Sequence, residues 1–282
     1  MTGSKVLSGK TAFITGGGGG IGSESALYLV RDGAAALLMG RRIKVLEQAR
    51  DRILCEVPDG QVELFAGDAA SEDDTRAAIA KAYAIQNCLD IVVPCVGGGV
   101  FRPFLMHDLK TFHEQMTYNL TTAFLTMRYG AARLKRGGSI VCISSNAAGN
   151  CTPWMSIYMA AKGAMEQLAR GAAEELGPAG IRVNVIRPGL TRTPLGEHES
   201  EDPRVYKAVI EEIPLNRTGV PPDIAAAVRY LAGPESSWVT GQILSVDGGA
   251  QLRKNPLMLD LVTEMFGEET MAAVRAGREP NS

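Results

Sequence analysis

A run of glycines near the start of the chain constrains the fold most. It occupies residues 16–20 and 22, after the apolar residues 12–14 and before a stretch with helical spacing at 21–31. A strand, a glycine-rich turn and a helix in this order cradle a dinucleotide pyrophosphate, because glycines let the phosphate approach the backbone and the first helical N–H groups face it. We predict that Gly16, Gly20, Ile21 and Gly22 bind a dinucleotide; the alternative is a flexible surface loop.

Apolar segments alternate with helical segments along the rest of the chain. The predicted strands are residues 12–14, 35–39, 62–65, 91–93, 140–143, 183–186 and 243–246. The predicted helices are residues 21–31, 43–54, 72–85, 109–134, 156–176 and 222–231. Continuous apolar strands separated by helices are typical of a parallel sheet covered on both faces. We therefore predict an α/β, single-domain, Rossmann-like doubly wound parallel sheet of about seven strands, with ligands at the edge where the strands end.

Composition excludes several classes of protein. The 282 residues have a formal net charge of −2, which offers no basic surface for nucleic acid. No apolar run is close to the length of a membrane span, about 18 residues. The N-terminus has no apolar segment long enough for a signal peptide. The five cysteines and three histidines have no metal-ligand spacing. We expect a soluble cytoplasmic protein with no metal site, no membrane partner and no nucleic-acid partner.

The end of the second predicted strand indicates which dinucleotide binds. In sheets of this kind an acidic residue there accepts from the ribose 2′-OH, whereas an arginine pairs with a 2′-phosphate. This strand ends in Gly40, Arg41 and Arg42. We expect Arg41 to contact the phosphate and NADP(H) to be favoured over NAD(H); alternatively, the arginines only cap the next helix. After the third strand, Asp68 either accepts from the adenine amino group or is a turn residue before the following helix.

Three side chains are candidates for proton transfer. Tyr158 and Lys162 are four residues apart, which places them on one face of a helix. A free tyrosine has a pKa near about 10, and a neighbouring ammonium favours the phenolate that can act as a base. Ser145 follows the predicted strand 140–143, where its hydroxyl can donate to a substrate oxygen. Alone, the Tyr–Lys spacing is equally expected of a solvated surface pair.

These motifs together resemble those of the short-chain dehydrogenase/reductase family over residues 8–250, which we expect to form the dinucleotide-binding and catalytic domain. The matching positions are residues 15–22, Asp68, Asn119, Ser145, Tyr158, Lys162, residues 188–189 and residues 246–249. The resemblance implies that Asn119, Ser145, Tyr158 and Lys162 are catalytic, and that Tyr158 and Lys162 also contact the cofactor. It implies that Asn119 kinks a helix and holds a water of the proton relay; taken alone, Asn119 is an ordinary helix residue.

The segment after the sixth predicted strand resembles the family segment that lies against the nicotinamide. The resemblance implies cofactor contacts from Pro188, Gly189, Thr191 and Thr193, with Thr193 bonded to the carboxamide; a simple turn is the alternative. One departure lies after the fourth strand, where the family usually has Asn-Asn-Ala-Gly and this chain has residues 94–97, Pro-Cys-Val-Gly. The amide that bridges neighbouring strands is therefore missing.

The expected reaction is reversible hydride transfer between NADP(H) and a secondary alcohol or ketone, with Tyr158 exchanging the proton. An NADPH-dependent enoyl or dienoyl thioester reductase and a non-catalytic NADP(H)-binding protein are the alternatives. Trp154, Met155 and Met159 flank the tyrosine and suggest an apolar, medium-sized substrate; alternatively, Met159 is a core residue. The resemblance implies a substrate lid over residues 194–218, which here contains an acidic stretch at 195–202. By resemblance the protein is a homotetramer or homodimer.

Residues 251–282 extend beyond the usual end of the family. Their apolar spacing predicts a C-terminal helical extension. This extension covers a neighbouring subunit's pocket, extends a dimer contact, or packs on its own subunit; the sequence leaves these three possibilities open.

Overall fold

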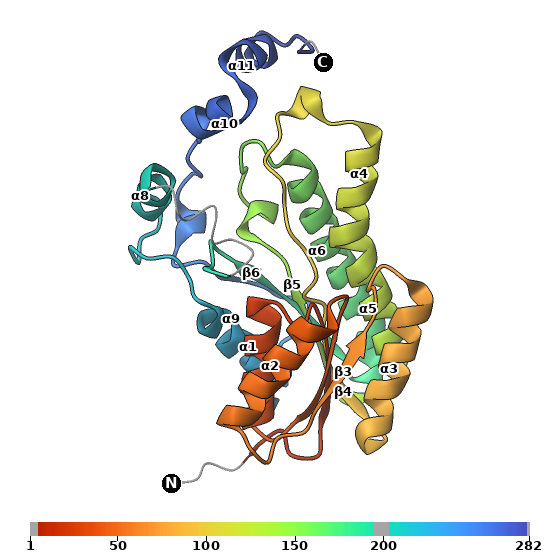
Figure 1. Cartoon of the computed structure of the whole chain (residues 1–282). Helices are drawn as coiled ribbons and strands as arrows, with labels where there is room; N and C mark the ends of the chain where they lie inside the picture. Colours follow the sequence, from red (N-terminus) through yellow and green to blue (C-terminus); the bar gives the residue numbers. More distant parts are fainter. Residues whose placement is uncertain (1–4, 194–202, 281–282) are drawn as a thin grey trace.

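A computed structural model describes residues 5–193 and 203–280 of the chain. Its centre is one sheet of seven parallel strands in the order β3-β2-β1-β4-β5-β6-β7 (Figure 1). The strands are β1 (Thr11–Thr15), β2 (Ala35–Gly40), β3 (Val62–Ala66), β4 (Leu89–Val93), β5 (Leu134–Ile143), β6 (Arg182–Pro188) and β7 (Ile243–Val246). The strand order reverses between β1 and β4, and in open α/β sheets ligands bind at such a point.

Helices cover both faces of the sheet, as the sequence predicts. The α-helices are α1 (Gly20–Arg31), α2 (Ile43–Glu56), α3 (Glu72–Gln86), α4 (Leu109–Met116), α5 (Thr122–Ala131), α6 (Ser156–Leu176), α8 (Pro203–Glu211), α9 (Pro221–Ala232), α10 (Leu259–Phe266) and α11 (Glu268–Arg275). Figure 1 shows α1, α2 and α9 on one side of the sheet and α3, α5 and α6 on the other.

Strand β2 shows why the strands read as continuous apolar runs. Ala36 and Leu38 pack into the core on the α1 side, whereas Leu37 and Met39 pack into the core on the α3 side. All four side chains are fully buried. A strand covered on both faces has no solvent-facing positions, so the alternation of apolar and polar residues is lost. The predicted doubly wound parallel sheet is confirmed.

One predicted helix differs from the structure. The segment 109–134 is interrupted by a π-helical turn, Thr117–Thr121, between α4 and α5, and β5 begins at Leu134. The Asn119 side chain donates to the Gln115 carbonyl at 3.0 Å and to the Gly98 carbonyl at 3.0 Å. A side-chain donor that occupies the i−4 carbonyl competes with the helix backbone, which explains the widened turn.

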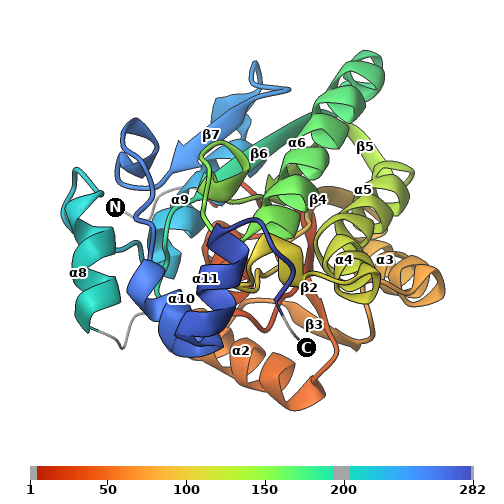
Figure 2. The ribbon, with the colours of Figure 1, turned by 90° about the horizontal axis from the view of Figure 1, so that it is seen from above.

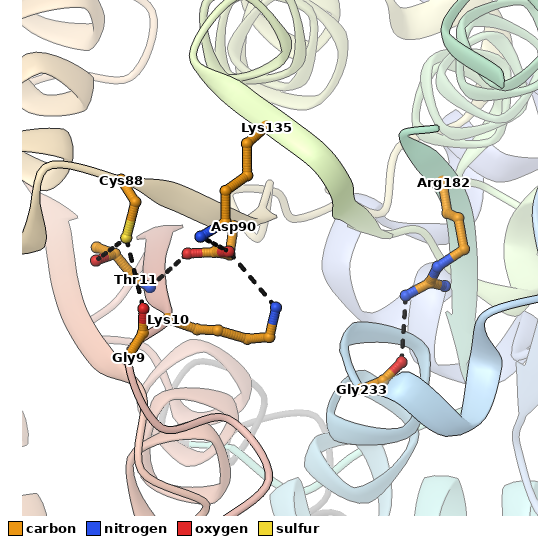
Figure 3. A network of polar contacts seen from close by, with 8 residues as sticks. All are labelled: Gly9, Lys10, Thr11, Cys88, Asp90, Lys135, Arg182 and Gly233. Atoms are coloured by element: carbon orange, nitrogen blue, oxygen red, sulfur yellow. Dashed lines mark hydrogen bonds and ion pairs between the residues drawn. The ribbon is translucent and has the colours of Figure 1, made fainter. Parts of the chain in front are cut away.

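A buried carboxylate joins three strands near their N-terminal ends, opposite the ends where ligands bind in such sheets (Figure 3). Asp90 of β4 is 2% exposed and accepts from the Thr11 amide at 3.0 Å. The ammonium groups of Lys135 and Lys10 lie 3.0 and 3.5 Å from Asp90 Oδ1. Burial alone would raise the Asp90 pKa, but these partners outweigh it and hold the pKa below its usual value. Asp90 therefore ties β1, β4 and β5 together.

Replacing Asp90 with alanine should destabilise the protein by about 2–4 kcal/mol, because the buried Thr11 amide and the two ammonium groups lose their acceptor. Since the folded pKa of Asp90 is lowered, its contribution to stability is present above the usual pKa of 3.8 and is lost as the pH falls through the folded value. Urea unfolding at pH 7 and pH 3 tests this expectation. Asp51→Ala, at a 66% exposed side chain, is the control; an equally small change in both variants would contradict the role of Asp90.

Candidate active site

A cavity of about 510 Å³ lies at the edge where the parallel strands end. Its walls come from the loops after six strands, from α8 with the residues that follow it, and from the C-terminal segment. Each of the six loops contributes at least one residue named in the sequence analysis. These include Gly16 after β1, Arg41 after β2, Asp68 after β3, Gly97 after β4, Ser145 after β5 and Thr191 after β6. The fold thus brings residues from most of the chain to one place.

The glycine-rich loop has the shape that a phosphate needs. Gly16 has φ +66°, in the left-handed region that favours glycine. A Cβ on Gly22 would lie 2.3 Å from the Gly16 carbonyl oxygen, so any side chain there would displace the loop. Gly19 caps α1 without a side-chain hydrogen bond, and Gly20 and Ile21 line the cavity. The N-terminus of α1 can therefore bind a diphosphate through its backbone amides.

The residues predicted to select the dinucleotide also line the cavity. Arg41 and Arg42 follow β2 with exposed side chains. Asp68 closes a turn, because its Oδ1 accepts from the Ala70 amide at 2.9 Å. This is the turn role that the sequence leaves open for Asp68, and its position on the cavity wall keeps the adenine contact open as well. The two guanidinium groups after β2 can bind a phosphate group in this part of the cavity.

Ser145, Tyr158 and Lys162 all line the cavity. The Lys162 side chain is 3% exposed, and its Nζ donates to the Ile143 carbonyl at 2.9 Å and lies 6.0 Å from the centre of the Tyr158 ring. Burial lowers the pKa of Lys162 to about 8, against the opposing effects of Cys95, Cys142 and Glu166. Ser145 Oγ accepts from the Ala147 amide at 3.2 Å, which leaves its hydroxyl proton to donate to a ligand.

Asn119 lies beside this group and outside the cavity lining. It is fully buried, and its Oδ1 accepts from the Gly98 amide at 3.0 Å. A Cβ on Gly97 would lie 2.5 Å from Lys162 Nζ and 2.9 Å from Asn119 Oδ1, so Gly97 is the position where the two side chains come close. The asparagine therefore fixes the loop after β4 against the buried ammonium.

The segment after β6 lines the cavity through Pro188, Gly189, Thr191 and Thr193. Thr191 Oγ1 donates to the Gly189 carbonyl at 2.9 Å, and Thr191 forms an isolated parallel bridge with Gly219. These contacts hold the segment as a defined turn at the cavity wall. The acidic stretch predicted as a lid, residues 195–202, lies outside the described residues.

The departure after β4 is compensated locally. Pro94 accepts from the Ile143 amide at 3.0 Å through its carbonyl, and the Cys95 amide donates to Thr15 Oγ1 at 3.3 Å. Backbone groups and a threonine thus link β4 to both neighbours where the family has an asparagine. Cys95 lines the cavity, and burial raises its pKa to about 12, which keeps the thiol protonated near pH 7.

A buried ion pair behind the site was not anticipated. The Arg187 guanidinium binds both carboxylate oxygens of Glu166, at 2.7 and 2.6 Å, and Ser144 Oγ donates to Glu166 at 2.7 Å. Glu166 is four residues after Lys162 on α6, while Ser144 directly precedes Ser145. The pair therefore fixes α6 against the loop that carries Ser145. The four-residue spacing after Lys162 is the sequence signal that could have indicated Glu166.

The C-terminal extension packs on its own subunit. Asn255, Pro256, Met258 and Leu261 line the same cavity as Tyr158. Within the described residues, no helix is long and apolar enough to span a bilayer. In the same part of the chain, no group of three or more His, Cys, Asp or Glu side chains is arranged to hold a metal ion.

Replacing Lys162 with methionine should change how stability depends on pH. Burial lowers the Lys162 pKa from its usual 10.5 to about 8, so between these values the unfolded chain binds a proton that the folded protein lacks. The free energy of unfolding of the wild type therefore gains a term that rises with pH across this window. At about 1.4 kcal/mol per pKa unit, Lys162→Met should lose about 3 kcal/mol relative to wild type from pH 8 to 10.5.

Urea unfolding across this pH range measures the effect. Lys44→Met, at an exposed position, is the control and should follow the wild type at every pH. The same profile in both variants would contradict a buried Lys162 whose pKa is lowered by burial.

Comparisons with known proteins agree with this geometry. The family model described as enoyl-(acyl carrier protein) reductase matches residues 16–251. Glucose 1-dehydrogenase of Gluconobacter oxydans (strain 621H) is 35% identical over 252 residues, 87% of this chain and 93% of that protein. The 7alpha-hydroxysteroid dehydrogenase of Escherichia coli (strain K12) is 34% identical over 245 residues, 86% of this chain and 94% of that protein.

A solved structure extends the similarity to the whole fold. A short-chain type dehydrogenase/reductase from Mycobacterium ulcerans matches with a TM-score of 0.90 at 33% identity, covering 95% of this chain and 98% of that chain. The seven-stranded parallel sheet and the glycine-rich turn after β1 agree with this match. The resemblance seen in the sequence is confirmed: the chain belongs to the short-chain dehydrogenase/reductase family of oxidoreductases.

Proposed function

We propose that this protein transfers a hydride reversibly between NADP(H) and a secondary alcohol or its ketone, with an apolar and medium-sized substrate. The observation that carries the proposal is the convergence of Ser145, Tyr158 and Lys162 on the cavity that the glycine-rich loop also lines. A proton-transfer group, an oxygen-binding hydroxyl and a diphosphate cradle in one cavity are what alcohol oxidation requires.

Each of these residues has a separate role in the proposed reaction. Bound NADP⁺ would supply the hydride acceptor. Ser145 donates a hydrogen bond to the substrate oxygen and fixes its position. Tyr158 accepts the hydroxyl proton during oxidation and returns a proton during reduction. The Lys162 ammonium, 6.0 Å from the Tyr158 ring centre, favours the phenolate by its charge and contacts the ribose. Asn119 supports this arrangement from behind the loop after β4.

NADP(H) is favoured because the chain offers two guanidinium groups where the ribose 2′ position would lie. Arg41 and Arg42 are exposed at the cavity wall, and an arginine pairs with a phosphate through two parallel hydrogen bonds. The glycine-rich loop and Asp68 accommodate the diphosphate and the adenine. Pro188, Gly189, Thr191 and Thr193 face the nicotinamide.

Replacing Arg41 and Arg42 together with alanine should raise the KM for NADP⁺ about 10- to 100-fold and leave that for NAD⁺ nearly unchanged. The loss of charge-assisted hydrogen bonds to a phosphate, about 1.5–3 kcal/mol, gives this range. Steady-state kinetics with both cofactors measure the ratio. Lys44→Ala removes one positive charge from the same helix region outside the cavity and should leave the ratio intact. A double variant that keeps the wild-type ratio would exclude the arginines as the phosphate site.

Replacing Tyr158 with phenylalanine should lower kcat by about 10²- to 10⁴-fold, because the proton acceptor is lost. The Kd for NADPH, measured by fluorescence, should stay close to the wild-type value. Tyr230→Phe, at a residue of α9 that is 40% exposed, provides the matched control with normal turnover. Retained turnover in Tyr158→Phe would rule out the proposed reaction.

A thioester reductase is the second candidate, because the matching family model is described as an enoyl-(acyl carrier protein) reductase. The intact Ser145 and Tyr158 spacing favours the alcohol reaction. NADPH oxidation with a panel of ketones and with an enoyl thioester separates the two. Tight NADPH binding without turnover of either would favour the third possibility, a non-catalytic NADP(H)-binding protein.

We also propose a homotetramer or homodimer in the cytoplasm. Phe112 and Phe124, on α4 and α5, are 40% and 41% exposed, which suits a helical contact between subunits. All five cysteines are free thiols, as expected of a reducing compartment.

A further inference from the structure

We infer that residues 253–266, here called the cap, place Pro256, Met258 and Leu261 in the substrate wall of this chain's own active site and thereby select alcohols with an apolar body. The inference rests on the proposed function and names its substrate class. The cap begins just beyond the family match, which ends at residue 251. The cap therefore lies in the part of the chain that the family model does not match.

Hydrogen bonds attach the cap to both sides of the cavity. On the side of Ser145, Asn255 Nδ2 donates to the Cys151 carbonyl at 3.2 Å and to Thr152 Oγ1 at 2.9 Å. Trp154 Nε1 donates to the Leu257 carbonyl at 2.6 Å. On the opposite side, Arg253 Nη1 donates to the Glu211 carbonyl of α8 at 2.5 Å. The cap therefore bridges the loop before Tyr158 and the C-terminal end of α8.

The backbone at this contact adopts conformations that bulky residues rarely adopt. Among the described non-glycine residues, four have positive φ, and two of these are Trp154 (φ +68°) and Met258 (φ +51°). Such conformations persist only where surrounding contacts determine them. Trp154 is held further by its carbonyl, which accepts from the Arg102 amide at 2.7 Å. Met258 caps α10 and turns the chain, and both Met258 and Leu261 line the cavity.

The cap residues that line the cavity are mainly apolar. Pro256, Met258 and Leu261 come from the cap. Val209, Ile213 and Met155 come from the surrounding wall, which also includes Glu212 and Thr152. The polar cap residue that lines the cavity, Asn255, donates from its amide to Cys151 and Thr152. In Figures 1 and 2, α10 and α11 lie above the sheet between α8 and α4. A substrate whose oxygen lies at Ser145 and Tyr158 thus has the apolar cap side chains around the rest of the molecule. This arrangement favours a ring or an alkyl chain over a polyol.

The first test varies the size of the cap residue against the size of the substrate. Leu261→Trp, which fills the cavity, should lower kcat/KM for dodecan-2-ol at least about tenfold while changing that for butan-2-ol less than threefold. Leu261→Ala should shift the preference toward the longer alcohol. Met265→Trp is the matched control, because Met265 lies on the same helix, is 55% exposed and is not among the cavity-lining residues. Unchanged NADPH affinity shows that each variant is folded.

The second test does not depend on turnover. The apolar dye 8-anilinonaphthalene-1-sulfonate should bind the wild-type protein and Met265→Trp equally, and Leu261→Trp at least about fivefold more weakly. Failure of all alcohols to turn over, with this binding pattern intact, would exclude the proposed reaction but support the cap. The cap is overturned if the dye does not bind the wild type, or if Leu261→Trp and Met265→Trp behave alike in either test.

Discussion

The buried ammonium of Lys162 is the interaction on which the arrangement of the site depends. Its hydrogen bond to the Ile143 carbonyl joins helix α6 to the end of β5. Burial makes the charged form unfavourable and lowers the Lys162 pKa to about 8, so the surrounding structure must support a group that alone would be better solvated. Glu166, four residues further along α6, provides part of that support through its negative charge.

The contacts of Glu166 support the loop after β5, which carries Ser145. The Glu166 carboxylate is bound by Arg187 of β6 and by Ser144 of the loop after β5. These contacts join β6, α6 and the loop into one unit behind the cavity wall. Ser145 of this loop and Tyr158 of α6 line the cavity, and the network joins the two elements that carry them. Rigid support behind a reactive surface is what precise positioning requires.

Much of the fold could be predicted because its signals are local. The glycine run, the apolar strands and the spacing of Tyr158 and Lys162 each lie within one element or one turn of the chain. The resemblance indicated a helix kink at Asn119, but the bond that ties its side chain to the Gly98 carbonyl, 21 residues away, could not be predicted from helix spacing. The same holds for the ion pair of Glu166 with Arg187, which joins a helix to a strand.

The location of the C-terminal extension could not be predicted from the sequence either, because it depends on contacts between residues far apart in the chain. Apolar spacing predicts its helices, yet three locations remained open, because a helix pattern does not say what its apolar side covers. The bond between Trp154 and Leu257 joins residues 103 positions apart. Only the folded arrangement of the loop after β5 decides that the extension returns to its own cavity.

The cap follows the glycine-rich loop late in the sequence, and this order has a consequence for biosynthesis. A chain emerges from the ribosome N-terminus first, and its early segments begin to fold while later ones are still being made. The glycine-rich loop, β1 and α1 are complete long before residues 253–266 exist. The glycine-rich loop therefore precedes residues 253–266 in time, and a chain that stopped before residue 253 would lack Pro256, Met258 and Leu261 of the cavity wall.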